Sequence, residues 1–477
     1  MNYRMIKYIL GWILVFEAFF LLIPGLTAVI YGERAIQPIL ITIAVCLVAG
    51  GLLIIKKPAN TELYSREGYV IVSLSWIVLS LFGALPFTLS GAIPRYIDAL
   101  FETVSGFTTT GASILPEVES LPKSLIMWRS FTHWVGGMGV LVFLMAFLPL
   151  SGGQNIHIMK AESPGPSVSK LVPRVRTTAL ILYSIYFVLT FLQFLFLLFG
   201  GMPVFDSINT ALATAGTGGF GIKNDSLGSY SPYLQNVTTV FMLLFSINFT
   251  SYYLIITKKF KDAFNREVRT FLIIVAASIG IITYNVRGMF GTIPEALRHV
   301  SFSVASIIST TGFSTADFDL WPELSRTILV LLMFIGACAG STGGGIKVSR
   351  VIILFKSLSK ELQMMIHPKQ IKKITMDSKT VEHETVRAVN SFIVCYILIF
   401  VLSIVAISID NHDLITNFTA VAAAVNNIGP GLAMVGPTQN FAFFSPISKA
   451  VLIFDMLAGR LELFPMLLLL NRATWKK

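Results

Sequence analysis

Charged side chains are scarce in this chain. Of its 477 residues, 13% are charged and 54% are hydrophobic, and the mean hydropathy is +0.75. Soluble proteins carry roughly 25% charged residues. The shortage of charge excludes a soluble globular fold and predicts an all-α protein that crosses a membrane several times.

Cysteine and histidine are also rare. The three cysteines, Cys46, Cys338 and Cys395, lie in apolar surroundings and form neither a disulfide framework nor a metal-ligand spacing. The six histidines are scattered along the chain. A polytopic membrane enzyme, such as a lipid-modifying transferase, would need His, Asp or Cys clustered at one depth, so an enzyme remains only the weakest alternative.

Apolar runs long enough to span a bilayer are abundant. A membrane span needs about 20 apolar residues. Ten such runs are predicted, near residues 6–31, 36–55, 68–90, 124–149, 177–200, 232–256, 270–290, 325–357, 388–409 and 446–471. The first run is too long for a signal peptide and lacks a small-residue cleavage site.

The net charge of +11 does not indicate a nucleic-acid partner, because the basic residues follow the predicted topology. Most of the 36 Lys and Arg residues fall in segments that face one side, including the loop 356–388 and the C-terminal tail. Cytoplasmic loops carry such an excess of positive charge. We therefore expect both termini to lie in the cytoplasm.

A glycine-centred stretch occurs four times. Residues 108–113 read TTTGAS, 215–220 read AGTGGF, 309–314 read STTGFS and 426–431 read NNIGPG. The copies align on Gly111, Gly218, Gly312 and Gly429. Such self-similarity indicates an architecture built from repeats.

A short, partly polar segment precedes each glycine. These segments, 96–107, 204–214, 294–309 and 413–425, are too short and too polar to cross a membrane alone. We expect re-entrant half-helices that enter from the outer face, each followed by irregular backbone. Irregular backbone is tolerated at membrane depth only where it is buried or lines a water-filled cavity.

The chemistry of the four stretches suits a cation. The C-terminal ends of four half-helices would bring partial negative charge to the bilayer midplane. Glycine permits dihedral angles that turn carbonyl oxygens inward, and rings of carbonyls replace the hydration shell of a cation. Threonine hydroxyls would add oxygen ligands. Acidic residues on the outer side would raise the local cation concentration: Glu117, Glu119, Asp225, Asp317, Asp319 and Glu323.

These four stretches resemble the filter sequences of the Trk/Ktr/HKT superfamily of potassium transporters. The resemblance covers essentially the whole chain, and the two spans before the first repeat resemble the bacterial Trk-type membrane subunit. It implies potassium uptake through ten helices, arranged as two leading spans (1–60) and four units of span, pore helix and span (61–150, 170–262, 263–360 and 380–477). It implies K⁺ bound at Thr109, Thr110, Gly111, Gly216, Thr217, Gly218, Thr310, Thr311, Gly312, Asn427, Ile428 and Gly429. The fourth copy departs from the others, because Ile428 replaces threonine and leaves only its carbonyl as a ligand.

Two further features indicate a gate. The glycine-rich stretch 340–347, which contains Gly343, Gly344, Gly345 and Lys347, should interrupt the span 325–357, since each glycine costs a helix about 1 kcal/mol relative to alanine. We expect Lys347 to extend toward the inner surface. Arg460 lies inside the last span, where a buried arginine faces a cavity or a partner such as Glu462. The resemblance implies that the loop and Arg460 restrict flow below the filter.

Partners and location follow from the same resemblance. It implies a homodimer in the bacterial inner membrane, with a cytoplasmic nucleotide-binding regulatory subunit. The basic loop 356–388 would bind that subunit or anionic lipid. The main alternative function is a proton- or sodium-coupled symporter, for which His133 is a candidate proton-linked site, although such a histidine more often packs between helices. Glu17 lies inside the first span but outside the fourfold unit, so we expect it to form a helix–helix contact.

Overall fold

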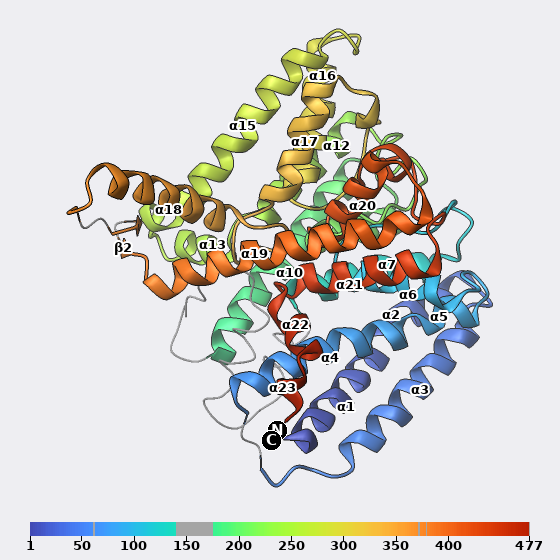
Figure 1. Cartoon of the computed structure of the whole chain (residues 1–477). Helices are drawn as coiled ribbons and strands as arrows, with labels where there is room; N and C mark the ends of the chain where they lie inside the picture. Colours follow the sequence, from blue (N-terminus) through green and yellow to red (C-terminus); the bar gives the residue numbers. More distant parts are fainter. Residues whose placement is uncertain (61–62, 140–174, 371–372, 378, 477) are drawn as a thin grey trace.

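The structure is a computed structural model in which helices dominate (Figure 1). It describes residues 1–60, 63–139, 175–370, 373–377 and 379–476. The predicted end of the span 124–149 and the basic residues Lys160, Lys170 and Arg174 lie outside this description. The strands of the described part are β1 (Thr375–Met376) and β2 (Lys379–Thr380), which pair antiparallel.

Six helices of the described part are long and apolar enough to cross a membrane without a break. They are Tyr3–Tyr31 (α1, Tyr3–Phe20, with α2, Leu22–Tyr31), α3 (Ile36–Ile54), Ser65–Leu89 (α4, Ser65–Gly83, with α5, Leu85–Leu89), α10 (Val175–Phe199), α15 (Arg266–Val286) and His383–Asp410 (α19, His383–Ile407, with η2, Ser408–Asp410). All six coincide with predicted spans. At 1.5 Å per residue, a helix of about 20 residues covers the roughly 30 Å of a hydrocarbon core.

Four short helices occupy the segments that precede the glycine stretches. They are α6 (Tyr96–Phe107), α11 (Val204–Gly216), α16 (Ile293–Ile308) and α20 (Leu414–Val425). Acidic residues or caps stabilise their first turns, as the helix dipole favours. At α20, the backbone N–H and hydroxyl of Thr416 donate to Asp413 and hold the pKa of that carboxyl below its usual value. The predicted short helices are therefore present, and each has an acidic residue or a polar cap at its N-terminal end.

The helix that follows each glycine stretch is short or divided. These helices are α7 (Lys123–Met138), α12 (Pro232–Ser246), α17 (Glu323–Ile335) and α21 (Pro446–Arg460). Three of them resume after a break as α13 (Phe249–Ile256), α18 (Val348–Ile366) and α22 (Phe464–Leu470). The sequence predicted only the break before α18, so two breaks were missed.

The two missed breaks have local causes. Between α12 and α13 the chain bends by 91°, and the side chain of Asn248 caps the new helix by accepting from the backbone N–H of Thr250. Between α21 and α22, Glu462 and Leu463 adopt positive φ, and Pro465 stands in the first turn of α22. Asparagine caps and proline end or start helices without any glycine.

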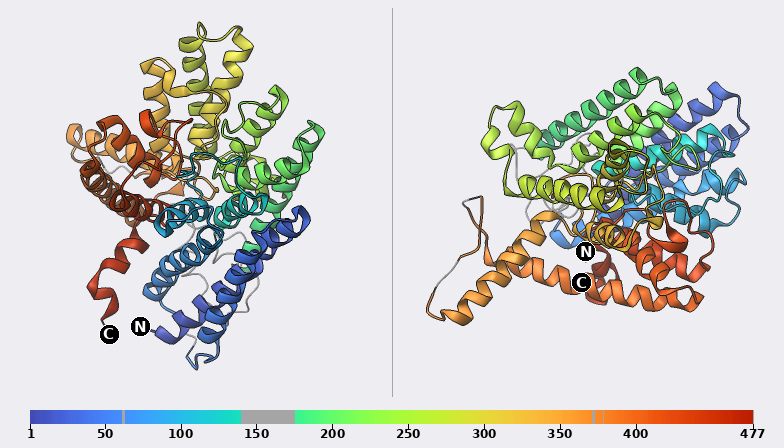
Figure 2. Two further views of the ribbon diagram at one scale, coloured as in Figure 1. Left: turned by 90° about the vertical axis from the view of Figure 1, so that its right-hand side faces the viewer. Right: turned by 90° about the horizontal axis from the view of Figure 1, so that it is seen from above.

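The two termini lie together on one side of the molecule, as Figures 1 and 2 show. The hydroxyl of Tyr3 donates to the carbonyl of Trp475 over 3.2 Å, next to α23 (Arg472–Trp475). The leading helices α1 and α3 pack against each other and α1 packs on α4, away from α15 and α16. Termini on a common side are what the predicted topology requires.

The remaining elements are short connections. They are α14 (Phe260–Ala263), η1 (Phe318–Leu320) and η3 (Ala433–Val435).

Candidate functional site

The four glycine stretches share one backbone conformation. Each short helix ends just before a residue in the left-handed region: Thr109 (φ 56°), Thr217 (φ 54°), Thr310 (φ 59°) and Asn427 (φ 55°). The next residue then donates its N–H to a carbonyl in the last turn of that helix, with distances of 2.8 to 2.9 Å: Thr110 to Ser105, Gly218 to Ala213, Thr311 to Ser306 and Ile428 to Ala423. The four stretches therefore share a backbone geometry as well as a sequence pattern.

This geometry corrects the alignment of the second copy. The glycines with positive φ, two residues after each left-handed residue, are Gly111 (79°), Gly219 (77°), Gly312 (87°) and Gly429 (99°). Gly219, not Gly218, is the equivalent of Gly111, and Gly216 is the last residue of α11. The second copy has several glycines in a row, so letters alone permitted more than one register. The second segment of the site is 217–219 rather than 216–218.

The four loops close into a ring. A Cβ atom added to Gly111 would overlap the carbonyl oxygen of Gly218, one on Gly219 would overlap that of Thr311, and one on Gly312 would overlap that of Ile428. A Cβ on Gly429 would lie 2.8 Å from the carbonyl oxygen of Thr110, which returns to the first loop. Each glycine thus lies against a carbonyl of the next repeat, and no larger residue fits there.

The threonine hydroxyls are largely engaged within the wall of the ring. The hydroxyl of Thr110 contacts that of Thr108 at 2.8 Å and accepts from the side-chain amide of Asn427 at 2.9 Å. The hydroxyl of Thr311 contacts that of Ser309 at 2.6 Å. Ile428 contributes only its carbonyl. Backbone oxygens are therefore the groups that all four copies share.

A cavity of about 150 Å³ forms one mouth of the ring and is lined by Gly111, Gly219, Gly312 and Gly429 among others. The six acidic residues expected near this mouth are absent from its lining, although all six are described. Two of them pair with Arg326 on α17 instead: Asp319 lies 2.9 Å and Glu323 lies 2.7 Å from its guanidinium. The basic residue Lys223 lines the cavity, so the cavity mouth is not surrounded by acidic side chains.

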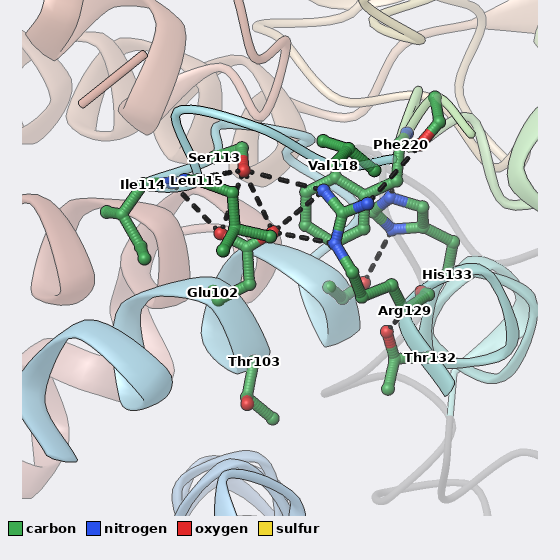
Figure 3. Close-up of polar contacts among 12 residues, drawn as sticks. Glu102, Thr103, Ser113, Ile114, Leu115, Val118, Arg129, Thr132, His133 and Phe220 are labelled. Atoms are coloured by element: carbon green, nitrogen blue, oxygen red, sulfur yellow. Dashed lines mark hydrogen bonds and ion pairs between the residues drawn. The ribbon is translucent and has the colours of Figure 1, made fainter. Parts of the chain in front are cut away.

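Between the loops of the first two repeats lies a buried ion pair that was not predicted from the sequence (Figure 3). The guanidinium of Arg129 on α7 lies 2.8 Å from the carboxylate of Glu102 on α6, and both side chains are buried. The signal was present, because Glu102 and Arg129 are charged residues inside otherwise apolar helices. Asp98 and Lys449 form a second pair, at 2.6 Å, nearer the start of α6.

His133 and Glu17 are both fully buried. His133 Nδ1 lies 2.7 Å from the carbonyl oxygen of Gly106, and its Nε2 accepts from the backbone N–H of Phe220 at 3.2 Å. His133 therefore packs between helix α7 and the second loop. Glu17 on α1 lies against α4, since a Cβ on Gly83 would come within 3.0 Å of its carboxylate.

The predicted interruption of the span 325–357 is confirmed, and residues 336–347 lie under the ring. The N–H of Gly344 donates to the hydroxyl of Thr310 at 2.6 Å, and the N–H of Gly345 donates to the carbonyl of Asn426 at 3.1 Å. Lys347 does not extend toward the inner surface as predicted. Its side chain is buried, and its ammonium group donates to the carbonyl of Gly343 inside the same loop.

Arg460, at the end of α21, holds three segments together. Its guanidinium donates to the carbonyls of Thr342, at 2.8 Å, and Gly137, at 2.7 Å, and also to Gly136. Glu462, the partner considered from sequence, pairs with Arg350 at the start of α18 instead. Arg460 therefore connects the interrupted helix to the inner end of α7.

Apolar helices of bilayer length around four joined loops define a helical, polytopic membrane protein. The family model for TrkH, described as a cation transport protein, matches residues 35–474. The chain therefore belongs to the TrkH family of cation transport proteins, whose members are transporters and not enzymes.

Individual relatives match over their full length. The chain is 36% identical to the Trk system potassium uptake protein TrkH of Salmonella typhimurium and 36% identical to that of Escherichia coli K12, with 100% of each chain covered. The crystal structure of the potassium transporter TrkH from Vibrio parahaemolyticus superposes with a TM-score of 0.90 at 32% identity, again over 100% of both chains.

Proposed function

We propose that this protein takes up potassium across the cytoplasmic membrane through the ring of four loops. The observation that carries the proposal is the closed cycle in which each glycine lies against a carbonyl oxygen of the next repeat. Carbonyl dipoles around a common axis replace the water that a potassium ion loses on entry. The names of the full-length relatives support potassium as the transported ion.

The filter residues are those of the ring. They are Thr109, Thr110, Gly111, Thr217, Gly218, Gly219, Thr310, Thr311, Gly312, Asn427, Ile428 and Gly429. K⁺ binds to their backbone oxygens, and the C-terminal ends of α6, α11, α16 and α20 contribute partial negative charge. In this proposal the chain has ten spans: two leading ones within 1–60, and four span–pore helix–span repeats within 61–150, 170–262, 263–360 and 380–477.

The gate lies below the filter. The loop 336–347, with Gly343, Gly344 and Gly345, contacts the inner ends of the third and fourth filter segments through bonds to Thr310 and Asn426. Arg460 ties this loop to α7. A fixed cation and a folded loop on the axis below a cation filter oppose the flow of cations until they move.

We also propose an orientation and an assembly. Both termini lie in the cytoplasm of a bacterium, the protein is a homodimer in the inner membrane, and a cytoplasmic nucleotide-binding subunit moves the gate. The helices α18 and α19 carry the basic loop 356–388 that would receive this subunit.

The experiment is uptake of rubidium, as a tracer for potassium, into proteoliposomes that contain the purified protein. The voltage is set, and external sodium and pH are varied in turn. We expect uptake that follows the voltage, is inhibited by potassium and is insensitive to the sodium and proton gradients. Absence of rubidium uptake would refute the proposed function. Uptake that requires a proton or sodium gradient would establish the symporter instead.

A further inference from the structure

Helix α7 carries two buried side chains that contact the second filter loop (Figure 3). Arg129 and His133 are four residues apart, so they share one face of the helix. The guanidinium of Arg129 lies 4.1 Å from the ring centroid of Phe220, and the imidazole of His133 lies 4.2 Å from it. Phe220 directly follows Gly219, so both side chains contact the second loop next to its filter glycine.

The same arginine holds the first filter loop through Glu102. Arg129 Nε and Nη2 both lie 2.8 Å from the Glu102 carboxylate. That carboxylate also accepts from the hydroxyl of Ser113 and from the N–H of Ile114, each at 3.0 Å. Ser113 and Ile114 follow Gly111 in the first loop. The buried charge of Glu102 is therefore paired and used to fix that loop.

On its other side, the guanidinium reaches the second repeat. Arg129 Nη1 donates to the carbonyl of Gly221 at 3.3 Å, and the N–H of Phe220 donates to His133 Nε2 at 3.2 Å. His133 in turn contacts the carbonyl of Gly106 at the end of α6. Glu102, Arg129 and His133, called the clamp below, thus join the first and second filter loops by polar contacts.

The other three repeats lack the residues of the clamp. Counted from the first residue of each helix, the equivalents of Arg129 are Thr238, Leu329 and Leu452, and those of His133 are Met242, Met333 and Met456. Counted from the loop-capping carbonyls, the equivalents of Glu102 are Thr210, Ser303 and Ala420. Charged and polar side chains hold the loops at the first junction, whereas small or apolar residues occupy the same positions elsewhere.

We propose that the clamp is a set of positioning residues that sets potassium over sodium selectivity at the junction of the first two repeats. This inference rests on the proposed function. Selectivity for the larger ion requires that the carbonyl oxygens of the ring keep their spacing. The second loop is the most flexible of the four by itself, because it contains a run of glycines. The fork of Arg129 restrains this loop, because its fixed geometry holds both loops at once.

The test compares Arg129→Lys and Glu102→Gln with the unchanged protein in rubidium and sodium uptake by proteoliposomes. Lysine keeps the charge but cannot make the forked contact, and glutamine keeps the shape but loses the charge. We expect each variant to lower the ratio of rubidium to sodium uptake by about tenfold, the factor that corresponds to one hydrogen bond to a charged group. The neutral double variant, Glu102→Gln with Arg129→Gln, removes the buried charges together and serves if a single variant folds poorly.

Asp98→Asn supplies the matched control. Asp98 belongs to the same helix α6 and is part of an ion pair with Lys449, but it does not contact a filter loop in any bond described above. We expect this variant to lose thermal stability and keep its selectivity, which separates positioning of the filter from general stability. A protein that takes up rubidium, but whose clamp variants keep the original ratio, would overturn the inference and leave the proposed function intact. Absence of any rubidium uptake by the unchanged protein would instead refute the proposed function.

Discussion

At the scale of single residues, the filter glycines are under two constraints at once. Gly111 has a φ of 79°, and a Cβ atom there would overlap the carbonyl oxygen of Gly218. The left-handed conformation alone costs a residue with a Cβ roughly 1–2 kcal/mol. The overlap adds to this and can be relieved only by moving the backbone of the neighbouring loop, which belongs to the proposed filter.

Gly111→Ser should therefore lower the ratio of potassium to sodium uptake, by roughly tenfold for a strain of that size. The measurement is competition between the two ions in proteoliposome uptake. Gly91→Ser is the matched control, since Gly91 also has positive φ (75°) but nothing lies within 4 Å of its missing Cβ. Equal loss of selectivity in both variants would contradict the assignment of Gly111 to the filter.

Arg460 offers a second prediction at this scale. Its guanidinium bonds to carbonyls of Thr342 in the interrupting loop and Gly137 in α7, so Arg460→Ala removes both a fixed positive charge and a contact across the proposed conduction path. We expect rubidium influx at fixed voltage to rise several-fold. Arg460→Lys keeps the charge and should raise influx less. A decrease in influx in the alanine variant would argue against a role as a barrier.

At the scale of elements, one carboxylate bonds both to the loop that interrupts the helix and to the first turn of α18. Glu267 at the start of α15 accepts from the N–H of Ala339 at 2.7 Å and from the N–H of Ser349 at 3.1 Å. Ala339 lies within the loop 336–347, and Ser349 is in the first turn of α18. This single side chain joins the loop to the start of α18 and holds the loop in its folded position.

Glu267→Ala should destabilise the loop, because two buried N–H groups lose their acceptor at about 1–3 kcal/mol each. We expect a lower thermal unfolding midpoint together with a higher basal rubidium influx. Glu267→Gln keeps an oxygen acceptor and should lose less on both measures. If glutamine and alanine variants behave alike, the bonds from Ala339 and Ser349 do not hold the loop.

At the scale of the whole molecule, the position of the termini defines the topology. Tyr3 contacts Trp475, and Arg66 in the first turn of α4 donates to the carbonyl of Lys476, so the N-terminus, the start of α4 and the C-terminus share one side. The outer cavity of the ring is lined by loops such as that of Lys223. In the proposed orientation, these two regions face opposite compartments.

Cysteine labelling in intact cells tests that orientation. In a variant whose Cys46, Cys338 and Cys395 are replaced by serine, a cysteine is placed at Lys476 or at Ser229, both of which are exposed. We expect a membrane-impermeant thiol reagent to reach position 229 directly, and position 476 only after the membrane is made permeable. The reverse pattern would place the termini outside the cell.

Much of the architecture was already decided by local sequence. Hydropathy located the six unbroken spans, and polar first turns located the four short helices, because both depend on residues close together in the chain. The glycine-rich run at 340–347 predicted its helix break for the same reason. Capping and proline rules could have predicted the breaks at Asn248 and Pro465. They were missed because the apolar residues on both sides gave a continuous hydrophobic run.

What the tertiary structure alone decided are relations between distant segments. Only the geometry of the ring identified Gly219 as the equivalent of Gly111. Adjacent glycines cannot be distinguished in the sequence, and they differ only in φ and in the atoms that surround them. Only packing paired Arg129 with Glu102 and Glu462 with Arg350, and buried Lys347 inside its own loop. The partner of a charge depends on where helices far apart in sequence meet, and that meeting is set by the packing of the whole bundle.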